Sequence, residues 1–589
     1  MKTDAFVPPL PKGLRSAEAD LWALDRTGGA DRRWRHRVMA HLPDDFAKSA
    51  VDHYRKLWLA GQSTAANTGL RELAESVDTC HARLARDNDA LILYARRRAH
   101  EASLIRARFP DTDLALTALQ KFANNHAIPS PGSPKPFTAK QAIARLCDEV
   151  WWRRTLRKIV GRSIERAAIK NNMVNSRHAL YVSDDTLRRR RMQRQRNREL
   201  IALMVAENET GQAVPLQDLV EHSLSNPHKR RAELMTRIAG CENYSIQHGH
   251  DALLVTLTCP SRFHASISHS GARNPKYSNT SPRDSQSFLR RQWSRVRTSL
   301  KRKTLHVYGV RIAEPHHDGT VHWHILVFGP ATDLSMFEEL CRHHWLSEDP
   351  DEPGARERRV SVVKIDRNMG TAAGYVAKYI SKNVDGEHVG VDFEDAKGRT
   401  ATNTAERVEA WASTWGIRQF QFFGQPLVTI WRELRRIRQP VLGPIEPFRA
   451  AADEGNWALY MQLMEASDSC VELIKAWNDR PDRYGDARGW EITGVRLRDT
   501  TVSTRNHIWI LKRVYLAKQT PYTEAIPYTD ATSTSSNTPY TEETPYTGPI
   551  LGIHTAIKLP SAARAATSAC AKNTDFCSVL DFASLESCH

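Results

Sequence analysis

Several features are missing from this chain of 589 residues, and each absence excludes a class of protein. Its nine cysteines form no Cys-x-x-Cys pair, which argues against a zinc ribbon and a disulfide framework and favours a reducing compartment. No apolar run reaches the ~18 residues that a membrane-spanning helix needs. Residues 1–9 contain no apolar signal core. The sequence therefore predicts a soluble intracellular protein with no membrane partner.

Positive charge, by contrast, is abundant. The net charge is +17 and the pI is near 9.5, which favours a polyanionic partner over the simpler alternative of a generally basic surface. Seven arginines lie within residues 188–198 and would repel one another unless phosphates neutralise them. A solvated helix face is the alternative for such a run. We favour nucleic-acid contact there.

Residues 1–240 predict a basic and mostly helical region. Trp152, Leu156, Ile159, Val160 and Ile164 recur at helical spacing, and arginines surround this apolar stripe. A solvated face again competes with DNA contact as the role of these arginines. The predicted DNA-binding residues come from both arginine groups: Arg153, Arg154, Arg157, Arg188, Arg189, Arg190 and Arg191.

Residues 241–390 change to alternating strands and helices. Strands are expected over 252–258, 305–314, 321–328 and 360–365, and helices over 287–301, 333–345 and 371–384. This strand-helix-strand-strand-helix-strand-helix order predicts an α+β fold with a central antiparallel sheet flanked by helices. Residues 391–515 are an extension of uncertain fold. Residues 516–589 repeat Pro-Tyr-Thr among small polar residues and are predicted to be disordered.

A candidate metal site follows from two histidines on one strand. Side chains alternate along a strand, so His322 and His324 share a face while Trp323 points to the other. The Asp318-Gly319 pair predicts a hairpin turn that would bring Glu314 beside them. Two imidazoles and a carboxylate suit Mg²⁺, Mn²⁺ or another divalent cation. The alternative is two structural histidines at a strand edge.

Four other histidines lie close to this strand in the sequence. His316 and His317 fall in the predicted turn and are spare ligand candidates. His343 and His344 are adjacent on a predicted helix, so they cannot share a face. We predict that this second pair is structural or lies on the surface.

The predicted helix over 371–384 carries a stripe of two phenols and two ammonium groups. Positions i, i+3, i+4 and i+7 share a helix face, and they hold Tyr375, Lys378, Tyr379 and Lys382. An adjoining apolar stripe explains how the helix packs, so the first stripe is expected to face outward. Partly buried aromatics with snorkelling lysines are the alternative. Beside a metal site on a basic chain, we favour two tyrosine nucleophiles.

These residue types suit cleavage of a phosphodiester. A phenol with a pKa of about 10 is a weak nucleophile, and a cation assists it by polarising the scissile phosphate. Lys378 or Lys382 can stabilise the phenolate or the transition state. A phosphotyrosine product conserves the phosphodiester energy, so the strand can be rejoined. A second tyrosine one turn away can attack a second phosphate.

Three short segments carry a family resemblance. Thr256-Leu257-Thr258, the set of Glu314 with His322-Trp323-His324, and the Tyr375/Tyr379 pair resemble the motifs of the HUH endonucleases in order and spacing. The two-tyrosine form is similar to the gene A replication initiator family of P2-like phages and prophages, over about residues 140–385. The resemblance implies a ferredoxin- or RRM-like sheet.

The same resemblance implies a rolling-circle initiator. Such an enzyme nicks one strand at an origin, links to the 5′ phosphate, leaves a 3′ hydroxyl as primer and later rejoins the strand. By resemblance, Glu314, His322 and His324 would hold the cation, and Tyr375 and Tyr379 would be the nucleophiles.

Partners and alternatives follow from the family as well. Its members act on single-stranded or origin DNA with a host helicase and DNA polymerase, in the cytoplasm of the bacterial host. The sequence contains no Walker A motif, so another protein would have to unwind the DNA. A plasmid relaxase or transposase of the same chemistry is one alternative. A non-catalytic DNA-binding protein of a prophage is the other.

Overall fold

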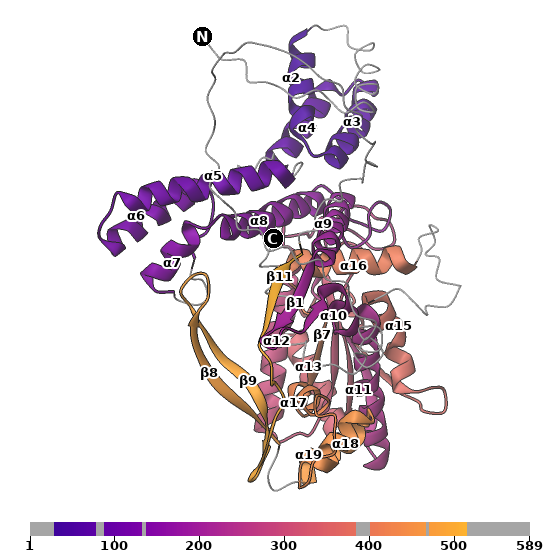
Figure 1. Cartoon of the computed structure of the whole chain (residues 1–589). Helices are drawn as coiled ribbons and strands as arrows, with labels where there is room; N and C mark the ends of the chain where they lie inside the picture. The colour runs from indigo at the N-terminus through magenta and orange to yellow at the C-terminus, as the bar shows by residue number, and fades with distance from the viewer. Residues whose placement is uncertain (1–28, 78–87, 132–136, 385–400, 467–470, 515–589) are drawn as a thin grey trace, which may run out of the picture.

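The structure is a computed structural model that describes residues 29–77, 88–131, 137–384, 401–466 and 471–514. It combines helices with antiparallel sheets, as the sequence predicts (Figure 1). Within the described ranges, no helix is both long and apolar enough to cross a membrane. The predicted disorder of residues 516–589 lies outside the described residues.

The first part of the chain is mostly helical, as expected. Its helices are α2 (Gly29–His41), α3 (Asp44–Leu59), α4 (Ser63–Val77), α5 (Asn88–Ala107), α6 (Thr112–Asn125), α7 (Ala139–Leu146), α8 (Glu149–Lys170), α9 (Asp184–Ala202), α10 (Leu216–His222) and α11 (Pro227–Gln247). Four of the five residues in the predicted apolar stripe of α8 are buried, namely Trp152, Leu156, Val160 and Ile164, and Ile159 is half-buried. Asp148 begins this helix by accepting the backbone N–H groups of Val150 and Trp151.

The central sheet has five antiparallel strands in the order β6-β3-β5-β4-β7. They are β3 (Asp251–Leu257), β4 (Tyr308–Pro315), β5 (Val321–Gly329), β6 (Val360–Lys364) and β7 (Phe420–Phe423). The four predicted strands are confirmed. The three predicted helices are confirmed too, as α12 (Pro282–Arg302), α13 (Ala331–Trp345) and α15 (Ala372–Val384).

Alternation along β5 separates two hydrophobic cores. Trp323, Ile325 and Val327 pack on one face of the sheet with residues of α12 and α13. Leu326 and Phe328 pack on the other face with residues of α11 and α15. Every residue of β4 and β5 is buried, because helices cover both faces of the sheet (Figure 1). His322 and His324 have the same parity as Leu326 and therefore face α15.

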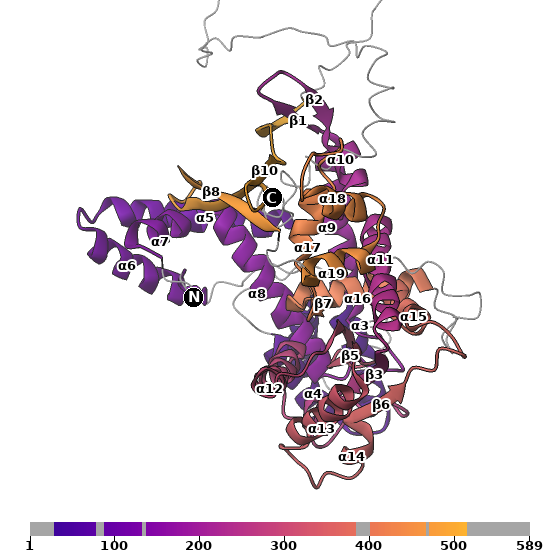
Figure 2. The ribbon, with the colours of Figure 1, turned by 90° about the horizontal axis from the view of Figure 1, so that it is seen from below.

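The remaining elements follow or border the central sheet. They are η2 (Ser261–Phe263), α14 (Ala355–Arg358), α16 (Ala401–Trp415), α17 (Val428–Leu434), α18 (Glu446–Asp453), α19 (Trp457–Ala466), β1 (Met204–Asn208), β2 (Ala213–Pro215), β8 (Glu472–Pro481), β9 (Ala487–Leu497), β10 (Thr500–Ser503) and β11 (Trp509–Arg513). Strands β8, β9 and β10 form one small sheet, and β11, β1 and β2 form another. Figure 2 shows β8 extending to one side of the molecule together with α5, α6 and α7.

The three ranges predicted as 1–240, 241–390 and 391–515 share a helix and two strand pairings. Residue 240 lies inside the continuous helix α11. Strand β7, from the third range, pairs with β4 and adds an edge to the central sheet. Strand β11, also from the third range, pairs with β1 of the first. The sequence pattern did not predict this mixing, because pairing partners so far apart leave no local signal.

Gly240 offers a test of how α11 packs. A Cβ atom there would lie 2.5 Å from Trp457 Cβ, where α11 meets α19. Alanine normally stabilises a helix relative to glycine, but this overlap should reverse the effect. We expect Gly240→Ala to lower the free energy of unfolding by about 1–3 kcal/mol in urea denaturation.

Gly161 of α8 supplies the matched control. A Cβ there meets nothing nearer than Arg189 Nη1, at 3.9 Å. Gly161→Ala should therefore be neutral or stabilise by about 0.5–1 kcal/mol. Equal effects of the two substitutions would contradict the close packing of α11 on α19.

Candidate active site

The β4–β5 hairpin sets the positions of three polar side chains. Its register places Glu314 opposite His322 and Ile312 opposite His324. At the turn, Gly319 has a φ of +83°, which favours glycine. The buried Asp318 carboxylate accepts the backbone N–H groups of Ala265 and Thr320, at 2.9 and 3.0 Å. The predicted turn and pairing are confirmed, and the register follows from them.

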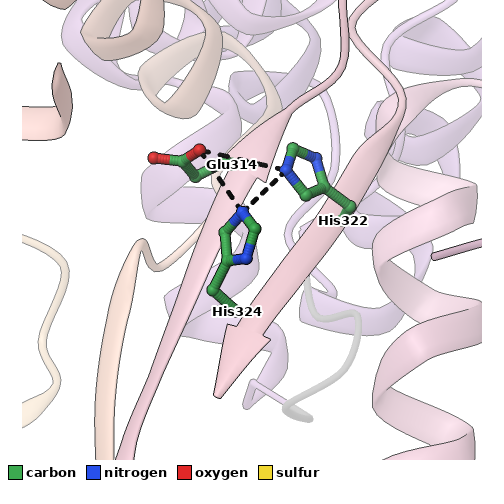
Figure 3. A group of neighbouring side chains, drawn as sticks. All are labelled: Glu314, His322 and His324. Carbon is green, nitrogen blue, oxygen red and sulfur yellow. Dashed lines mark hydrogen bonds and ion pairs between the residues drawn. The ribbon is translucent and has the colours of Figure 1, made fainter. Parts of the chain in front are cut away.

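Glu314, His322 and His324 converge on one point (Figure 3). Their ligand atoms all lie within 4.8 Å of one another, and all three residues are buried. The Glu314 Oε2 atom lies 3.9 Å from His322 Nε2 and 3.7 Å from His324 Nε2. The two Nε2 atoms are 3.1 Å apart. Two imidazole nitrogens and a carboxylate oxygen facing one point are a donor set that fits a divalent cation.

Burial keeps both imidazoles neutral. It lowers the pKa of His322 well below its usual value, and the neighbouring His316 and His324 lower it further. Burial likewise lowers the pKa of His324 to about 3, with contributions from Lys382 and Lys378. A neutral imidazole keeps a lone pair for a cation. The Nδ1 atom of His324 lies 3.0 Å from Thr256 Oγ1, which orients its Nε2 toward Glu314.

Helix α15 supplies the other contacts of Glu314. Lys382 Nζ lies 3.2 Å from Glu314 Oε2, and the Asn383 side-chain amide donates to Glu314 Oε1. Burial opposes the charge of Lys382, but Glu314 and Tyr181 raise its pKa above the usual value. The expectation that this whole stripe faces outward is therefore wrong for Lys382. Its ammonium turns inward because a buried carboxylate needs a countercharge.

The two tyrosines differ in their surroundings. The Tyr379 ring stacks on His324, with centroids 4.1 Å apart and planes 24° apart, so its phenol belongs to the Glu314 cluster. Lys378 is exposed, and its Nζ lies 4.9 Å from the centre of the Tyr379 ring. Tyr375 lies one turn earlier on α15 and packs half-buried against the second core. The spacing alone does not reveal this difference.

Glu242 holds the beginning of α15 in place. This buried carboxylate of α11 accepts the backbone N–H groups of Ala372 and Ala373, at 2.6 and 3.2 Å. A negative charge at a helix N-terminus satisfies free N–H groups and the helix dipole. Sequence reasoning missed Glu242 and Asn383, because nothing in their local pattern distinguishes them from other polar residues.

The spare histidines have separate outcomes. The His316 ring is half-buried with its centroid 4.1 Å from that of His322, so this residue does border the cluster. His317 Nε2 lies 3.2 Å from the Ser266 carbonyl oxygen, away from the three converging atoms. His343 is exposed on α13 and His344 is half-buried beside it, as the sequence predicts.

Carboxylates pair with several arginines of the run on α9. Its ion pairs are Arg188 with Asp45, Arg189 with Asp185, Arg190 with Glu409 and Arg191 with Glu406. The assumption that only phosphates could relieve the repulsion is therefore wrong. The carboxylates come from α3, α9 itself and α16, and two of these segments are remote in sequence. DNA contact by these four arginines stays a prediction.

The arginines of α8 are partly buried. Arg157 Nη2 donates to Asn88 Oδ1 at 2.7 Å, and burial lowers the pKa of Arg157 to about 10. Burial also lowers the pKa of Arg153. Arg154 is half-buried beside them. DNA contact by Arg153, Arg154 and Arg157 stays a prediction as well.

The fold and site together define a mixed helix-and-sheet protein with a candidate divalent-cation centre beside a tyrosine-bearing helix. Residues 110–387 match the family described as bacteriophage replication gene A protein (GPA). This region, just under half of the chain, therefore resembles the replication gene A protein family. The resemblance seen in the sequence motifs is thereby confirmed.

Curated relatives agree with this family. The replication gene A protein of Escherichia phage 186 is 39% identical over 328 residues, covering 54% of this chain and 47% of that protein. The replication gene A protein of Escherichia phage P2 is 39% identical over 366 residues, covering 59% and 48%.

A probable replication endonuclease from a prophage-like region of Salmonella paratyphi A is 35% identical over 375 residues, covering 60% of this chain and 46% of that protein. The chain spans about half the length of the curated relatives it matches. No solved structure matches it significantly.

The Lys382–Glu314 ion pair can be tested in metal-free protein. Lys382→Met leaves the Glu314 carboxylate buried without its countercharge. We expect a loss of up to about 3 kcal/mol in the free energy of unfolding, measured by urea denaturation in EDTA. Because folding raises the pKa of Lys382, the loss should be complete at neutral pH and should shrink as pH rises through that pKa.

Two variants make this measurement specific. Adding Glu314→Gln to Lys382→Met removes the unpaired charge and should restore part of the stability. Lys378→Met removes an exposed ammonium and should change the stability little. If Lys378→Met destabilises the chain as much as Lys382→Met does, the inward ion pair is not the cause.

Proposed function

We propose that this chain initiates phage DNA replication as a site-specific, metal-dependent single-strand endonuclease. It nicks one strand at the origin through a 5′-phosphotyrosine intermediate, leaves a 3′ hydroxyl as primer and rejoins the strand at termination. The observation that carries the proposal is the Tyr379 ring stacked on His324, within the Glu314–His322–His324 cluster. The family match and the replication names of the relatives support it.

The order of the strands supports an HUH nuclease domain. Strands β3, β4, β5 and β6 alternate with helices as β3-α12-β4-β5-α13-β6 and lie in the order β6-β3-β5-β4. This connectivity supports the proposal, because a split βαβ arrangement is expected of ferredoxin-like sheets. It places the histidine strand β5 in the middle of the sheet.

The proposed cation ligands are Glu314, His322 and His324. The residues fit such a group, because the Nε2 atoms of both histidines lie 3.1 Å apart and both point at the Glu314 carboxylate. A bound Mg²⁺ or Mn²⁺ supplies charge stabilisation at the scissile phosphate. Thr256 and Asn383 orient His324 and Glu314, respectively.

In this proposal, the attacking group is the phenol of Tyr379. In the proposed step, Tyr379 loses its proton and its Oη attacks the phosphorus, while the bond from phosphorus to the 3′ oxygen breaks. The leaving 3′ oxygen takes up a proton and becomes the primer hydroxyl. Lys378 is the ammonium placed to stabilise the phenolate, since Lys382 is engaged by Glu314. Rejoining is the reverse attack of a 3′ hydroxyl on the phosphotyrosine.

Tyr375 supplies the second nucleophile in this proposal. One helical turn separates it from Tyr379, so it can attack the regenerated origin while the first tyrosine is still linked to DNA. Lys382 contributes by holding the buried Glu314 carboxylate in position.

The proposed setting is the cytoplasm of the bacterial host, with origin DNA as the substrate. Because the sequence contains no Walker A motif, we propose that a host helicase opens the duplex and a host polymerase extends the primer. The replication names of the relatives favour this role over a plasmid relaxase, a transposase or a non-catalytic DNA-binding protein.

The nucleophiles can be identified by trapping. The test uses tiled single-stranded oligonucleotides from the replicon that carries the gene, with Mn²⁺ present. We expect the unaltered chain to form a covalent adduct whose mass-mapped peptide contains Tyr375 or Tyr379. The double variant Tyr375→Phe/Tyr379→Phe should form none, because phenylalanine has no nucleophilic oxygen.

Tyr181→Phe is the control, since this tyrosine lies near Lys382 but outside α15. It should still form the adduct. An adduct that persists in the Tyr375→Phe/Tyr379→Phe variant would show that another group attacks the phosphate.

The cation site has its own readout. His324→Ala removes one of three proposed ligands and should weaken Mn²⁺ binding by at least about 10–100-fold, measured by electron paramagnetic resonance without DNA. Cleavage should fall in parallel. His343→Ala, an exposed histidine of α13, should bind Mn²⁺ as the unaltered chain does. Unchanged Mn²⁺ affinity in His324→Ala would show that His324 is not a ligand of the cation.

A further inference from the structure

A large open groove lies beside the candidate active site. It has a volume of about 1310 Å³ and is bordered by α9, α10, the beginning of α11, α16 and the segment from β7 into α17. These elements adjoin one another in both views of the molecule (Figures 1 and 2). The groove is far larger than the small space between Glu314 and the two histidines, so it has room for an extended ligand.

The lining of the groove is strongly basic. Seven arginines and four glutamates line it. In the described part of the chain, Arg198, Arg230, Arg237 and Arg418 form no ion pair with a carboxylate. Arg237 is only 7% exposed, and its Nε atom has no hydrogen-bond partner. Glu233 is the nearby carboxylate that favours the charge of Arg237, but no carboxylate pairs with it directly. A buried guanidinium with no direct ion pair is costly, which points to an anionic ligand.

Apolar and aromatic surface lies among these charges. The Arg237 guanidinium lies 3.5 Å from the centre of the half-buried Phe422 ring. Leu427 is 62% exposed at the groove. Phosphates suit the arginines, and unstacked bases suit the apolar surface. A duplex hides the faces of its bases, so this combination favours a single strand over a duplex.

The groove reaches the candidate active site through two amides. Asn383 and Gln419 both line it. The Gln419 side-chain amide donates to Asn383 Oδ1 at 3.0 Å, and the Asn383 amide donates to Glu314. The end of the groove is therefore one side chain away from the candidate cation ligands.

We propose that this groove binds single-stranded DNA on one side of the scissile phosphate. The inference rests on the proposed function, because it assigns a path to the substrate of that same site. Glu406 and Glu409 of α16 pair with Arg190 and Arg194 at the groove, and Glu406 also pairs with Arg191 outside it. These carboxylates keep the arginines extended toward the groove in free protein and compete with phosphates for them.

Binding of DNA can be measured separately from cleavage. The full chain is titrated in EDTA against fluorescent poly(dT) of graded length, by anisotropy at several salt concentrations. The groove variant Arg194→Ala/Arg198→Ala should weaken binding by about 10-fold or more and reduce the slope of log K against log salt by about 1–2. A matched variant, Arg96→Ala/Arg97→Ala, removes the same charge from exposed positions on α5 and should change both quantities much less.

The carboxylates give an effect of opposite sign. Glu406→Gln/Glu409→Gln should bind poly(dT) several-fold more tightly, a gain that a misfolded chain would not show. Photo-cross-links from 5-iodouracil oligonucleotides should map to Phe422 or to neighbouring groove residues. A duplex of the same length should bind less tightly than poly(dT).

Several outcomes would overturn the inference. They are a groove variant that behaves like the α5 variant, a glutamine variant with no gain in affinity, or equal binding of duplex and single strand. In any of these cases the groove serves another ligand, such as a protein segment. Loss of covalent adducts with intact poly(dT) binding would instead count against the proposed function and leave the groove assignment standing.

Discussion

The organisation of this protein depends on one buried carboxylate. Glu314 is 1% exposed, and its charge must be met by groups that arrive from elsewhere in the fold. Lys382 and Asn383 approach from α15, while His322 and His324 approach from the paired strand. The full set of contacts requires the hairpin and the helix to be in place together. The carboxylate thus joins the central sheet to the helix that carries both tyrosines.

The same sheet also separates structural from chemical tasks. The odd-numbered residues of β5, among them Trp323, face a core covered by α12 and α13. The other parity places His322 and His324 toward α15 and continues as Leu326 and Phe328 in a second core. A shift of one residue in register would exchange the two faces, so the core packing that holds the register also holds the histidines in place.

Local signals account for what the sequence could predict. A short turn joins Glu314 to His322, and its Asp318-Gly319 pair can be recognised in the sequence. The proximity of the two residues therefore follows from hairpin geometry. The stripe of Tyr375, Lys378, Tyr379 and Lys382 follows from helical spacing. Helical spacing does not predict that Lys382 turns inward, because its partner, the Glu314 carboxylate, lies 68 residues away in the chain. The edge strand β7 and the β1–β11 pairing likewise depend on remote partners.

The arginines of α9 illustrate why composition alone misleads. A run of like charges indicates a need for counterions, but it does not say which ones. Here Asp45, Glu406 and Glu409 supply them within the protein. Such partly exposed pairs are individually weak, so phosphates can replace the carboxylates at modest cost. Internal pairing is therefore compatible with the proposed nucleic-acid binding. Under that proposal, a ligand must offer enough phosphates, in the right places, to displace glutamates that already pair with these arginines.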